Sequence, residues 1–223
     1  ERDSRGMCEV VNFSKDRPSA SLKRVLNEFP TFIRDSDAVT IVRKVLAKKE
    51  ATMSGQVSSR KPFGLSTTAR PEKSGELRLR WRGGEGLFPR KKVTAGIELI
   101  DRWKVITSRA SYDHAGNPGK DGRRRVLATV EILEPGVICT ETYLVAGAFD
   151  TRTEAKNLVA YMKTRFFRFL LAQLMYSHDL AKSSYEFVPV LDMTKRWSDA
   201  DLFQRYDITE IEQEWIQARI REF

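Results

Sequence analysis

The stretch TRTEAKNLVAYMKTRFFRFLLAQLM, residues 151–175, decides the fold class. It opens with Thr151-Arg152-Thr153-Glu154, the spacing of a capping box, in which each end's side chain accepts a hydrogen bond from the other's backbone N–H. Arg165 and Arg168 lie on the flank of the helix that follows, and the pattern leaves their role open. The helix is predicted to run through about residue 175 with one apolar face packed into a core, formed by Leu158, Met162, Phe166, Phe169, Leu170 and Leu174.

Three further segments carry helix signals. Residues 36–49 are predicted to form a helix with Ser36 as its N-cap, because apolar residues recur there at helical spacing. A second helix begins at Ser198, and a third begins at Thr209, where Glu212 completes a capping box. Residues 151–223 are thus expected to be a helical C-terminal part.

Alternation of apolar and charged residues identifies the clearest strand. In residues 76–82 the apolar side chains Leu77, Leu79 and Trp81 point to one face, and the opposite face carries Arg78, Arg80 and Arg82. Further strands are predicted at residues 7–13, 103–107, 125–133 and 137–146, with a polar turn at 14–20 and a long loop at 110–122. We therefore predict an α+β fold, with a mixed, mostly antiparallel sheet within residues 76–146, flanking helices at 36–49, 151–175 and 198–222, and a helical C-terminal end.

Basic residues are concentrated in the middle of the chain. The whole chain has a net charge of +9, but residues 41–125 alone hold 21 Lys and Arg against 8 Asp and Glu, a net charge of +13. Residues 1–40 are neutral, and residues 126–223 carry a net charge of −4. Such a block attracts polyanions, and its Gly, Ser and Pro residues are unlike the amphipathic basic helix that is typical of membrane contact. We expect nucleic acid as the partner, a merely solvated basic surface being the alternative.

The candidate DNA contacts lie in the strands and loops of this block. Arginines in a row can face phosphates and base edges, or they can solvate an edge strand and prevent aggregation. Basic loops at residues 89–92 and 120–125 favour the first interpretation. The main candidates are Arg78, Arg80, Arg82, Arg90, Lys91, Lys92, Arg123, Arg124 and Arg125, followed by Arg60, Lys61, Lys104, Ser108 and Arg109.

Catalytic motifs are incomplete in this sequence. His114 and His178 lie far apart without the signature of a partnering nucleophile. The sequence has neither a Gly-x-Gly-x-x-Gly motif nor a phosphate loop. Glu154-Ala155-Lys156 has the acid-x-Lys spacing of metal-dependent nucleases, but a capping role already explains Glu154. We predict no catalytic residue, no metal ligand and no cofactor bound by this chain.

Two compositional features bear on the compartment. Cys8 and Cys139 have no second Cys or His at ligand spacing, so both are expected to be apolar filler in a reducing compartment, the cytoplasm. No run of 18 apolar residues occurs, so no membrane partner is expected.

Five segments resemble, in order, the C-terminal region of one family. They are Ser59-Arg60-Lys61-Pro62-Phe63-Gly64-Leu65, Thr140-Glu141-Thr142-Tyr143-Leu144, YMKTRFFRFL at residues 161–170, Phe187-Val188-Pro189 and Trp197-Ser198-Asp199-Ala200-Asp201-Leu202. The family is the gamma-type N6-adenine DNA methyltransferases of restriction-modification systems. Residues 1–6 also resemble the stretch that follows the catalytic domain of that family.

The resemblance implies that catalysis and target recognition belong to different parts of the protein. The family's N-terminal part binds S-adenosylmethionine and methylates a flipped adenine, and its C-terminal part recognises the target. Residues 1–35 would then be a lead-in from a catalytic domain, and residues 36–223 would be the target-recognition domain, which binds duplex DNA. The Asn-Pro-Pro-aromatic motif is absent, since Asn117-Pro118-Gly119 lacks the second Pro and the aromatic residue. Whether this chain is itself enzymatic stays open. The alternatives are part of a restriction endonuclease or a fused cleavage and methylation enzyme, and a module that docks a partner subunit.

Overall fold

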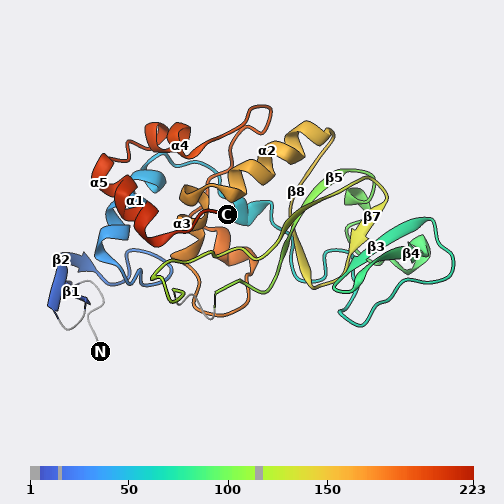
Figure 1. Ribbon diagram of the computed structural model, residues 1–223, viewed down its shortest axis with the longest axis horizontal. Helices are drawn as coiled ribbons and strands as arrows, with labels where there is room; N and C mark the ends of the chain where they lie inside the picture. Colours follow the sequence, from blue (N-terminus) through green and yellow to red (C-terminus); the bar gives the residue numbers. More distant parts are fainter. Residues whose placement is uncertain (1–5, 15–16, 114–117) are drawn as a thin grey trace.

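The helices lie at the left and centre of the molecule and the two three-stranded sheets at its right, while a two-stranded hairpin lies at the left beside the helices (Figure 1). The structure is a computed structural model that describes residues 6–14, 17–113 and 118–223. Residues 1–5 of the expected lead-in and residues 114–117 of the expected long loop lie outside the described residues. The helices are α1 (Ser36–Ala47), α2 (Arg152–Lys163), α3 (Arg165–Ala172), α4 (Asp199–Arg205) and α5 (Glu210–Arg219). The α+β class and the helical C-terminal end predicted from the sequence are confirmed.

The strands form three small sheets. A hairpin pairs β1 (Met7–Ser14) with β2 (Arg17–Val25). The second sheet has the order β4-β3-β7, with β3 at Leu77–Trp81, β4 at Gly84–Phe88 and β7 at Val137–Cys139. The third has the order β6-β5-β8, with β5 at Trp103–Ser108, β6 at Val130–Leu133 and β8 at Tyr143–Phe149. The pairing of β3 with β7 is parallel, and the other strand pairs in the described part of the chain are antiparallel.

The single sheet expected within residues 76–146 is wrong, because the predicted strand at 137–146 divides. Residues 140–142 leave the extended conformation, and the Tyr143 N–H closes a turn on the Thr140 carbonyl at 3.1 Å. As a result β7 ends in one sheet and β8 begins in the other. The polar turn expected at residues 14–20 is also wrong, since β2 already begins at Arg17.

The β6-β5-β8 sheet lies between two hydrophobic cores. Neighbouring residues of β5 point to opposite faces, so Val105 packs in the larger core and Ile106 packs in the smaller one. The larger core lies under α1, α2 and α3, and the smaller core lies between this sheet and β4-β3-β7. Burial on both faces explains why β5 and β8 have long apolar runs rather than alternation.

The stretch at residues 151–175 forms two helices rather than the single helix predicted. Thr164 adopts an extended conformation, and its hydroxyl caps α3 by accepting a hydrogen bond from the Phe167 N–H at 3.1 Å. The Asp199 carboxylate accepts from the N–H groups of Arg165 and Phe166, at 3.0 and 2.8 Å. The backbone N–H groups that lose helical partners at the break therefore donate to a side chain at the start of α4. Helical spacing in the sequence does not reveal this partner.

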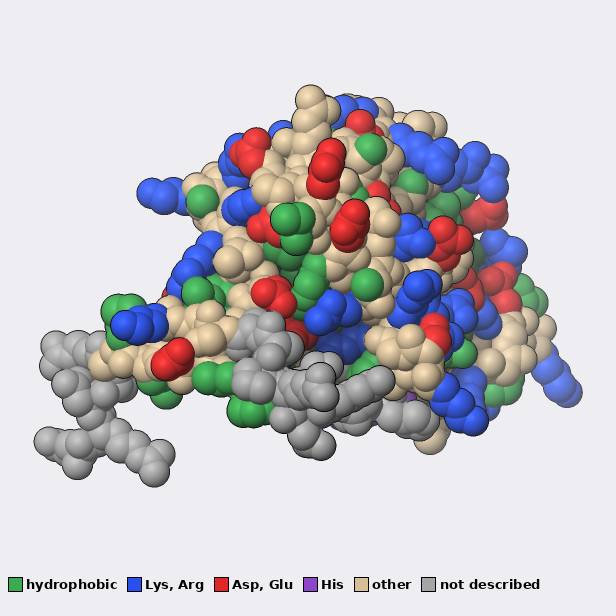
Figure 2. Space-filling model, turned by 60° about the vertical axis from the view of Figure 1, so that its left-hand side comes forward, with side chains coloured by type: hydrophobic (Ala, Val, Ile, Leu, Met, Phe, Trp, Pro, Cys, Tyr) green, Lys and Arg blue, Asp and Glu red, His purple; other side chains and the backbone are tan. Residues whose placement is uncertain are grey.

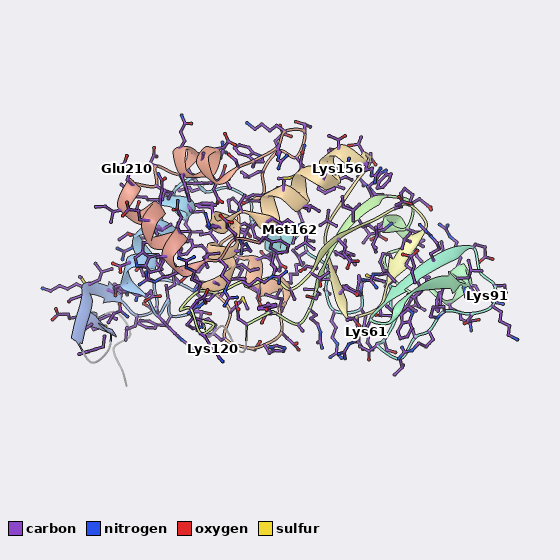
Figure 3. All side chains as sticks on the ribbon, in the orientation of Figure 1. Lys61, Lys91, Lys120, Lys156, Met162 and Glu210 are labelled. Atoms are coloured by element: carbon purple, nitrogen blue, oxygen red, sulfur yellow. The ribbon has the colours of Figure 1, made fainter. Side chains whose placement is uncertain are left out.

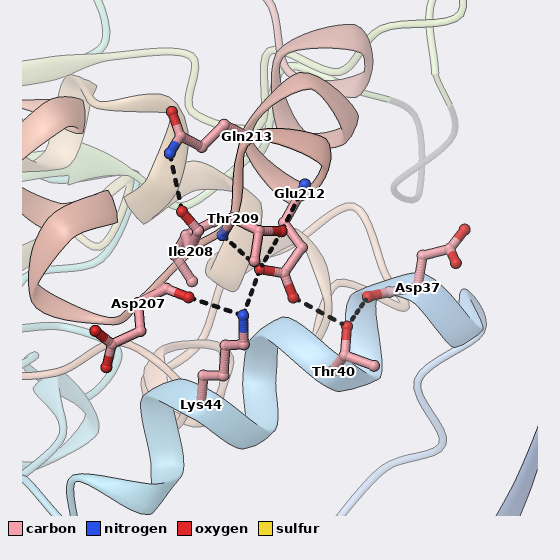
Figure 4. Close-up of polar contacts among 8 residues, drawn as sticks. All are labelled: Asp37, Thr40, Lys44, Asp207, Ile208, Thr209, Glu212 and Gln213. Carbon is pink, nitrogen blue, oxygen red and sulfur yellow. Dashed lines mark hydrogen bonds and ion pairs between the residues drawn. The ribbon is translucent and has the colours of Figure 1, made fainter.

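The capping boxes at Thr151 and Thr209 are confirmed, and Ser198, the predicted start of the second helix, caps α4 in a box with Asp201. At Thr209, the box includes Glu212. Figure 4 shows that the Glu212 carboxylate at the start of α5 also accepts a hydrogen bond from the Lys44 ammonium of α1, at 2.6 Å. Burial would raise the pKa of Glu212, but Lys44 and Thr209 donate to the carboxylate and lower it overall. The predicted N-cap of α1 is wrong by one position, because Asp35 is the cap residue and Ser36 is the first residue of the helix.

Arg168 is a structural residue at the centre of the helical end. Its side chain is buried, and its Nε donates to the carbonyls of Lys163 and Thr164, both at 3.2 Å. Its two terminal nitrogens donate to the carbonyls of Arg125 and Arg221, at 3.2 and 2.8 Å. One guanidinium thus joins the break between α2 and α3 to a basic loop and to the C-terminal segment.

Replacing Arg168 by Met should lower the free energy of unfolding by about 3 kcal/mol or more, because four carbonyls lose a charged, buried donor. Arg165 provides a matched control on the same helix, since its ion pair is with the exposed Glu222. Arg165→Met should cost less than about 1 kcal/mol. Urea denaturation of the two variants measures both values. Equal losses would contradict the assigned role of Arg168.

Candidate nucleic-acid interface

The segment Thr140 to Tyr143 brings several predicted site residues together. Its backbone bonds to three separate parts of the chain, because the Thr140 N–H donates to the Arg80 carbonyl and the Thr142 carbonyl accepts from the Arg109 N–H. The Glu141 N–H donates to the Leu65 carbonyl at 2.9 Å. The end of β3, the end of β5 and the loop at residues 59–65 therefore meet at one edge.

Arg60 is held at this edge by an ion pair. Its Nε donates to the Glu141 carboxylate at 2.6 Å, and the same carboxylate accepts from the Thr67 N–H at 3.1 Å. The hydrogen bond from Arg60 lowers the pKa of Glu141. The Glu141 side chain is 5% exposed, whereas that of Arg60 is 62% exposed. The buried carboxylate therefore positions a guanidinium that still faces solvent.

The arginines of β3 differ more than their alternation predicts. Arg78 is exposed, with Glu85 and Glu134 near its guanidinium at 3.1 and 3.3 Å. Arg80 is half-buried and makes two hydrogen bonds to Glu131, both at 2.9 Å. These bonds raise the pKa of Arg80. Both residues are already neutralised by carboxylates, so they are weaker candidates for phosphate contact than the sequence indicates.

Arg82 is not on the strand. It lies in the turn between β3 and β4, where its side chain is exposed, and no carboxylate in the described part of the chain pairs with it. Lys61 is likewise exposed, on the loop that carries Arg60, and it too has no ion pair with a described residue. These two are the least neutralised of the candidates near residues 140–143.

Ser108 and Arg109 end β5 at the same edge. The Ser108 hydroxyl donates to the Ala110 carbonyl at 2.9 Å, so this side chain is used within its own loop. Arg109 forms an ion pair with Asp179 at 3.4 Å and remains partly exposed. From here the chain enters the loop that returns at Val126, where the Tyr112 N–H donates to the Val126 carbonyl.

The three consecutive arginines of the returning loop lie in three different environments. Arg123 is exposed. Arg124 is half-buried and lines a cavity of about 150 Å³ between the helices. Arg125 lies against the rings of Tyr112 and Phe223, at 4.7 and 5.2 Å from their centroids. Of the three, Arg123 alone is freely presented to a large ligand.

The turn at Arg90, Lys91 and Lys92 lies at the opposite end of the β3–β4 hairpin. Figure 3 shows Lys91 at the far right end of the molecule, whereas Lys61 and Lys120 lie along its lower margin. Arg90 pairs with Asp101 at 3.0 Å and Lys92 pairs with Glu72 at 2.6 Å. The structure therefore separates these three candidates from the others.

Lys104 is wrongly assigned to the surface. Its side chain is fully buried, and its ammonium group donates to the carbonyls of Ile100 and Arg102 at 2.7 Å and of Glu134 at 3.1 Å. Burial lowers the pKa of Lys104 to about 8. The sequence misleads here because a lysine in an otherwise apolar strand resembles an exposed edge position.

We call Arg60, Lys61, Arg82, Arg109 and Arg123 the basic edge; the first four lie on segments that meet at residues 140–143, and Arg123 lies on the returning loop. A groove of about 460 Å³ adjoins it, lined by Arg60 and Lys61 and also by Lys182, which sequence reasoning missed. Lys182 has no other basic residue next to it in the sequence, so no basic cluster marks it as a candidate for anion contact. The basic edge is a surface that can accept an extended anion without a catalytic group.

The described residues lack two features. They contain no group of three or more His, Cys, Asp or Glu side chains placed to hold a metal ion. They also contain no helix with the length and apolar character needed to cross a membrane.

No protein-family model matches this chain, and no curated protein matches it.

The titration of Lys104 should appear in the pH dependence of stability. Its folded-state pKa of about 8 lies below the value of 10.5 for an exposed lysine, so the unfolded chain holds more protons between these pH values. The free energy of unfolding should therefore rise with pH through this window, by up to about 3 kcal/mol, relative to Lys104→Met. Denaturant titrations of both proteins at pH 7 to 10.5 measure the difference, in which other titrating groups cancel. A difference that stays flat would show that the ammonium is not buried.

Proposed function

We propose that this chain binds duplex DNA sequence-specifically, as the target-recognition part of an adenine-specific DNA methyltransferase of a restriction-modification system. One observation carries the proposal. The segments that carry Arg60 and Lys61, Arg82, and Arg109 meet at residues 140–143, although they are far apart in the sequence. Arginine in excess at an exposed edge suits phosphate contact, and its planar fork suits the acceptor edge of guanine.

The ion pairs supply the rigidity that such a surface requires. Glu141 orients Arg60 and Asp179 orients Arg109, so these guanidiniums are held in place before any ligand arrives. Arg82, Lys61 and Arg123 have no carboxylate partner among the described residues, so a phosphate would meet no competitor there. In this proposal the paired cations fix the register and the unpaired cations provide most of the affinity.

Methyl transfer is assigned to a separate catalytic part that would bind S-adenosylmethionine. The residues of this chain do not fit that cofactor, since the sequence lacks both the glycine-rich motif and the Asn-Pro-Pro-aromatic motif. We place the contact with the catalytic part at the β1–β2 hairpin. Its outer face exposes Met7 and Phe13, each about two-thirds accessible, together with Val11. Exposed apolar side chains gathered on one strand face are typical of a protein contact.

Charge reversal at the basic edge tests DNA binding. Arg82→Glu and Arg123→Glu should each weaken binding to a duplex and reduce the slope of log affinity against log salt by about 1, because each removes one phosphate contact. The slopes are measured by fluorescence anisotropy over a salt series, with a labelled duplex of random sequence and the complete chain.

Lys91→Glu is the matched control. It changes charge by the same amount at an exposed lysine that has no ion pair in the described structure, but at the opposite end of the hairpin. This variant should leave the salt slope unchanged. The proposal fails if the wild-type chain does not bind duplex, or if Lys91→Glu reduces the slope and the two edge variants do not.

A further inference from the structure

A second basic feature lies among the helices, away from β3. It is the cavity of about 150 Å³ that Arg124 lines, bounded by the ends of α3 and α5, the residue before α1, and the loop at residues 118–124. Figure 2 views the molecule from the side of α1 and α5 and shows basic side chains set back in a hollow near the lower middle of this face. The cavity has an apolar wall and a cationic rim, which require separate explanations.

The wall is aromatic. Phe169 and Trp215 line the cavity, and their rings pack edge to face with centroids 5.7 Å apart. Ala172 and Ile220 complete the apolar lining. A cavity of this volume admits a ring about the size of benzene. The wall therefore offers a flat apolar group a place that water fills poorly.

The rim carries arginines without carboxylate partners. Arg124 and Arg219 line the cavity, and Arg34 lines a small adjoining pocket that shares Arg124 and Asp35 with it. Within the described part of the chain, none of the three arginines forms an ion pair. Fourteen ion pairs occur elsewhere in that part of the chain, so unpaired arginines here are not the general condition of this surface. Asp35 is the one acidic residue among the described residues that line the two pockets.

A helix terminus accounts for part of this charge. Arg219 is in the last turn of α5, where the dipole of the helix favours a cation, and its guanidinium lies 3.8 Å over the Trp215 ring. Arg124 is not on a helix. Its backbone is fixed by hydrogen bonds with the Arg219 carbonyl at 2.7 Å and the Arg221 N–H at 3.0 Å. The fold thus places the Arg124 side chain at the rim through its main chain.

Holding Arg124 at this rim carries an electrostatic cost. Burial lowers its pKa, Asp35 and Asp113 oppose that effect, and the nearby Arg34 and Arg219 lower it further. A partly buried cation beside two like charges is stabilised when an anion joins it. The rim therefore has the electrostatics of an anion site, and the wall beside it selects an anion that carries a flat apolar group.

We infer that this cavity binds a phosphate monoester of a planar group, a nucleoside monophosphate being the class, with the phosphate on Arg124, Arg219 and Arg34 and the ring against Phe169 and Trp215. The ligand can be a free nucleotide or the phosphorylated end of a nucleic-acid strand, since both present the same chemistry. This site is separate from the duplex contact proposed above, because it uses side chains that lie outside the basic edge.

Calorimetry with uridine monophosphate, whose base is a single six-membered ring about the size of benzene, tests the inference on the complete chain. The nucleotide should bind at one site, more tightly than inorganic phosphate or uridine alone, and it should raise the melting temperature of the chain. Arg124→Gln and Arg219→Gln should each weaken binding about tenfold or more, because each removes a charged donor. Lys91→Gln is the control, since it removes one positive charge from an exposed side chain that does not line the cavity, and it should bind as the wild type does.

Two oligonucleotide arms identify the source of the ligand. If a 5′-phosphorylated trinucleotide binds more tightly than both its 5′-hydroxyl form and the mononucleotide, the site takes a strand end. If it binds no more tightly than the mononucleotide, the site takes the free nucleotide. The inference is overturned if the wild-type chain shows no saturable binding of the mononucleotide, or if both Arg124→Gln and Arg219→Gln bind it undiminished. Neither result bears on Arg82, so the duplex proposal stands or fails separately.

Discussion

The position of the helical end depends on one buried guanidinium. Arg168 donates to carbonyls of Lys163, Thr164, Arg125 and Arg221, and burial lowers its pKa to about 10, so it stays charged at neutral pH. Two of these acceptors belong to the break between α2 and α3. The other two belong to the returning loop and to the C-terminal segment. A neutral side chain of similar size would leave all four without this donor, which is why a charge is retained in an apolar core.

This anchor determines what the loop can present. The Arg125 carbonyl is fixed by Arg168, and the N–H groups of Arg125 and Val126 donate to the Asp113 carboxylate at 3.2 and 2.7 Å. Val126 has a φ of 71°, a conformation that a β-branched residue adopts only where its surroundings hold it. Because the backbone is held at this point, the directions in which the neighbouring arginine side chains leave the loop are fixed. Arg123 stays outward and Arg124 stays at the cavity rim.

Local signals in the sequence were sufficient for much of the fold. The capping boxes at Thr151 and Thr209 and the alternation around Leu79 depend on residues close together in the chain, and these predictions are confirmed. The break at Thr164 depends instead on Asp199, which lies 34 positions from Arg165. Similarly, the burial of Lys104 depends on carbonyls that only the folded chain brings together. Partners remote in sequence leave no periodic pattern, so neither feature could be predicted.

The same limit applies to the candidate site, because the net charge of a sequence segment does not include carboxylates that fold against it from elsewhere in the chain. The +13 block predicted a basic surface, but the sequence does not show which of its cations are neutralised by carboxylates. Two acidic residues that follow the block in the sequence neutralise cations within it, since Glu131 binds Arg80 and Glu141 binds Arg60. A phosphate that approaches Arg80 must displace a carboxylate held by two hydrogen bonds, whereas one that approaches Arg82 displaces water. Within the described part of the chain, Lys61, Arg82 and Arg123 have no carboxylate partner, so an anion that binds the basic edge is positioned by where carboxylates are missing as much as by where arginines are present.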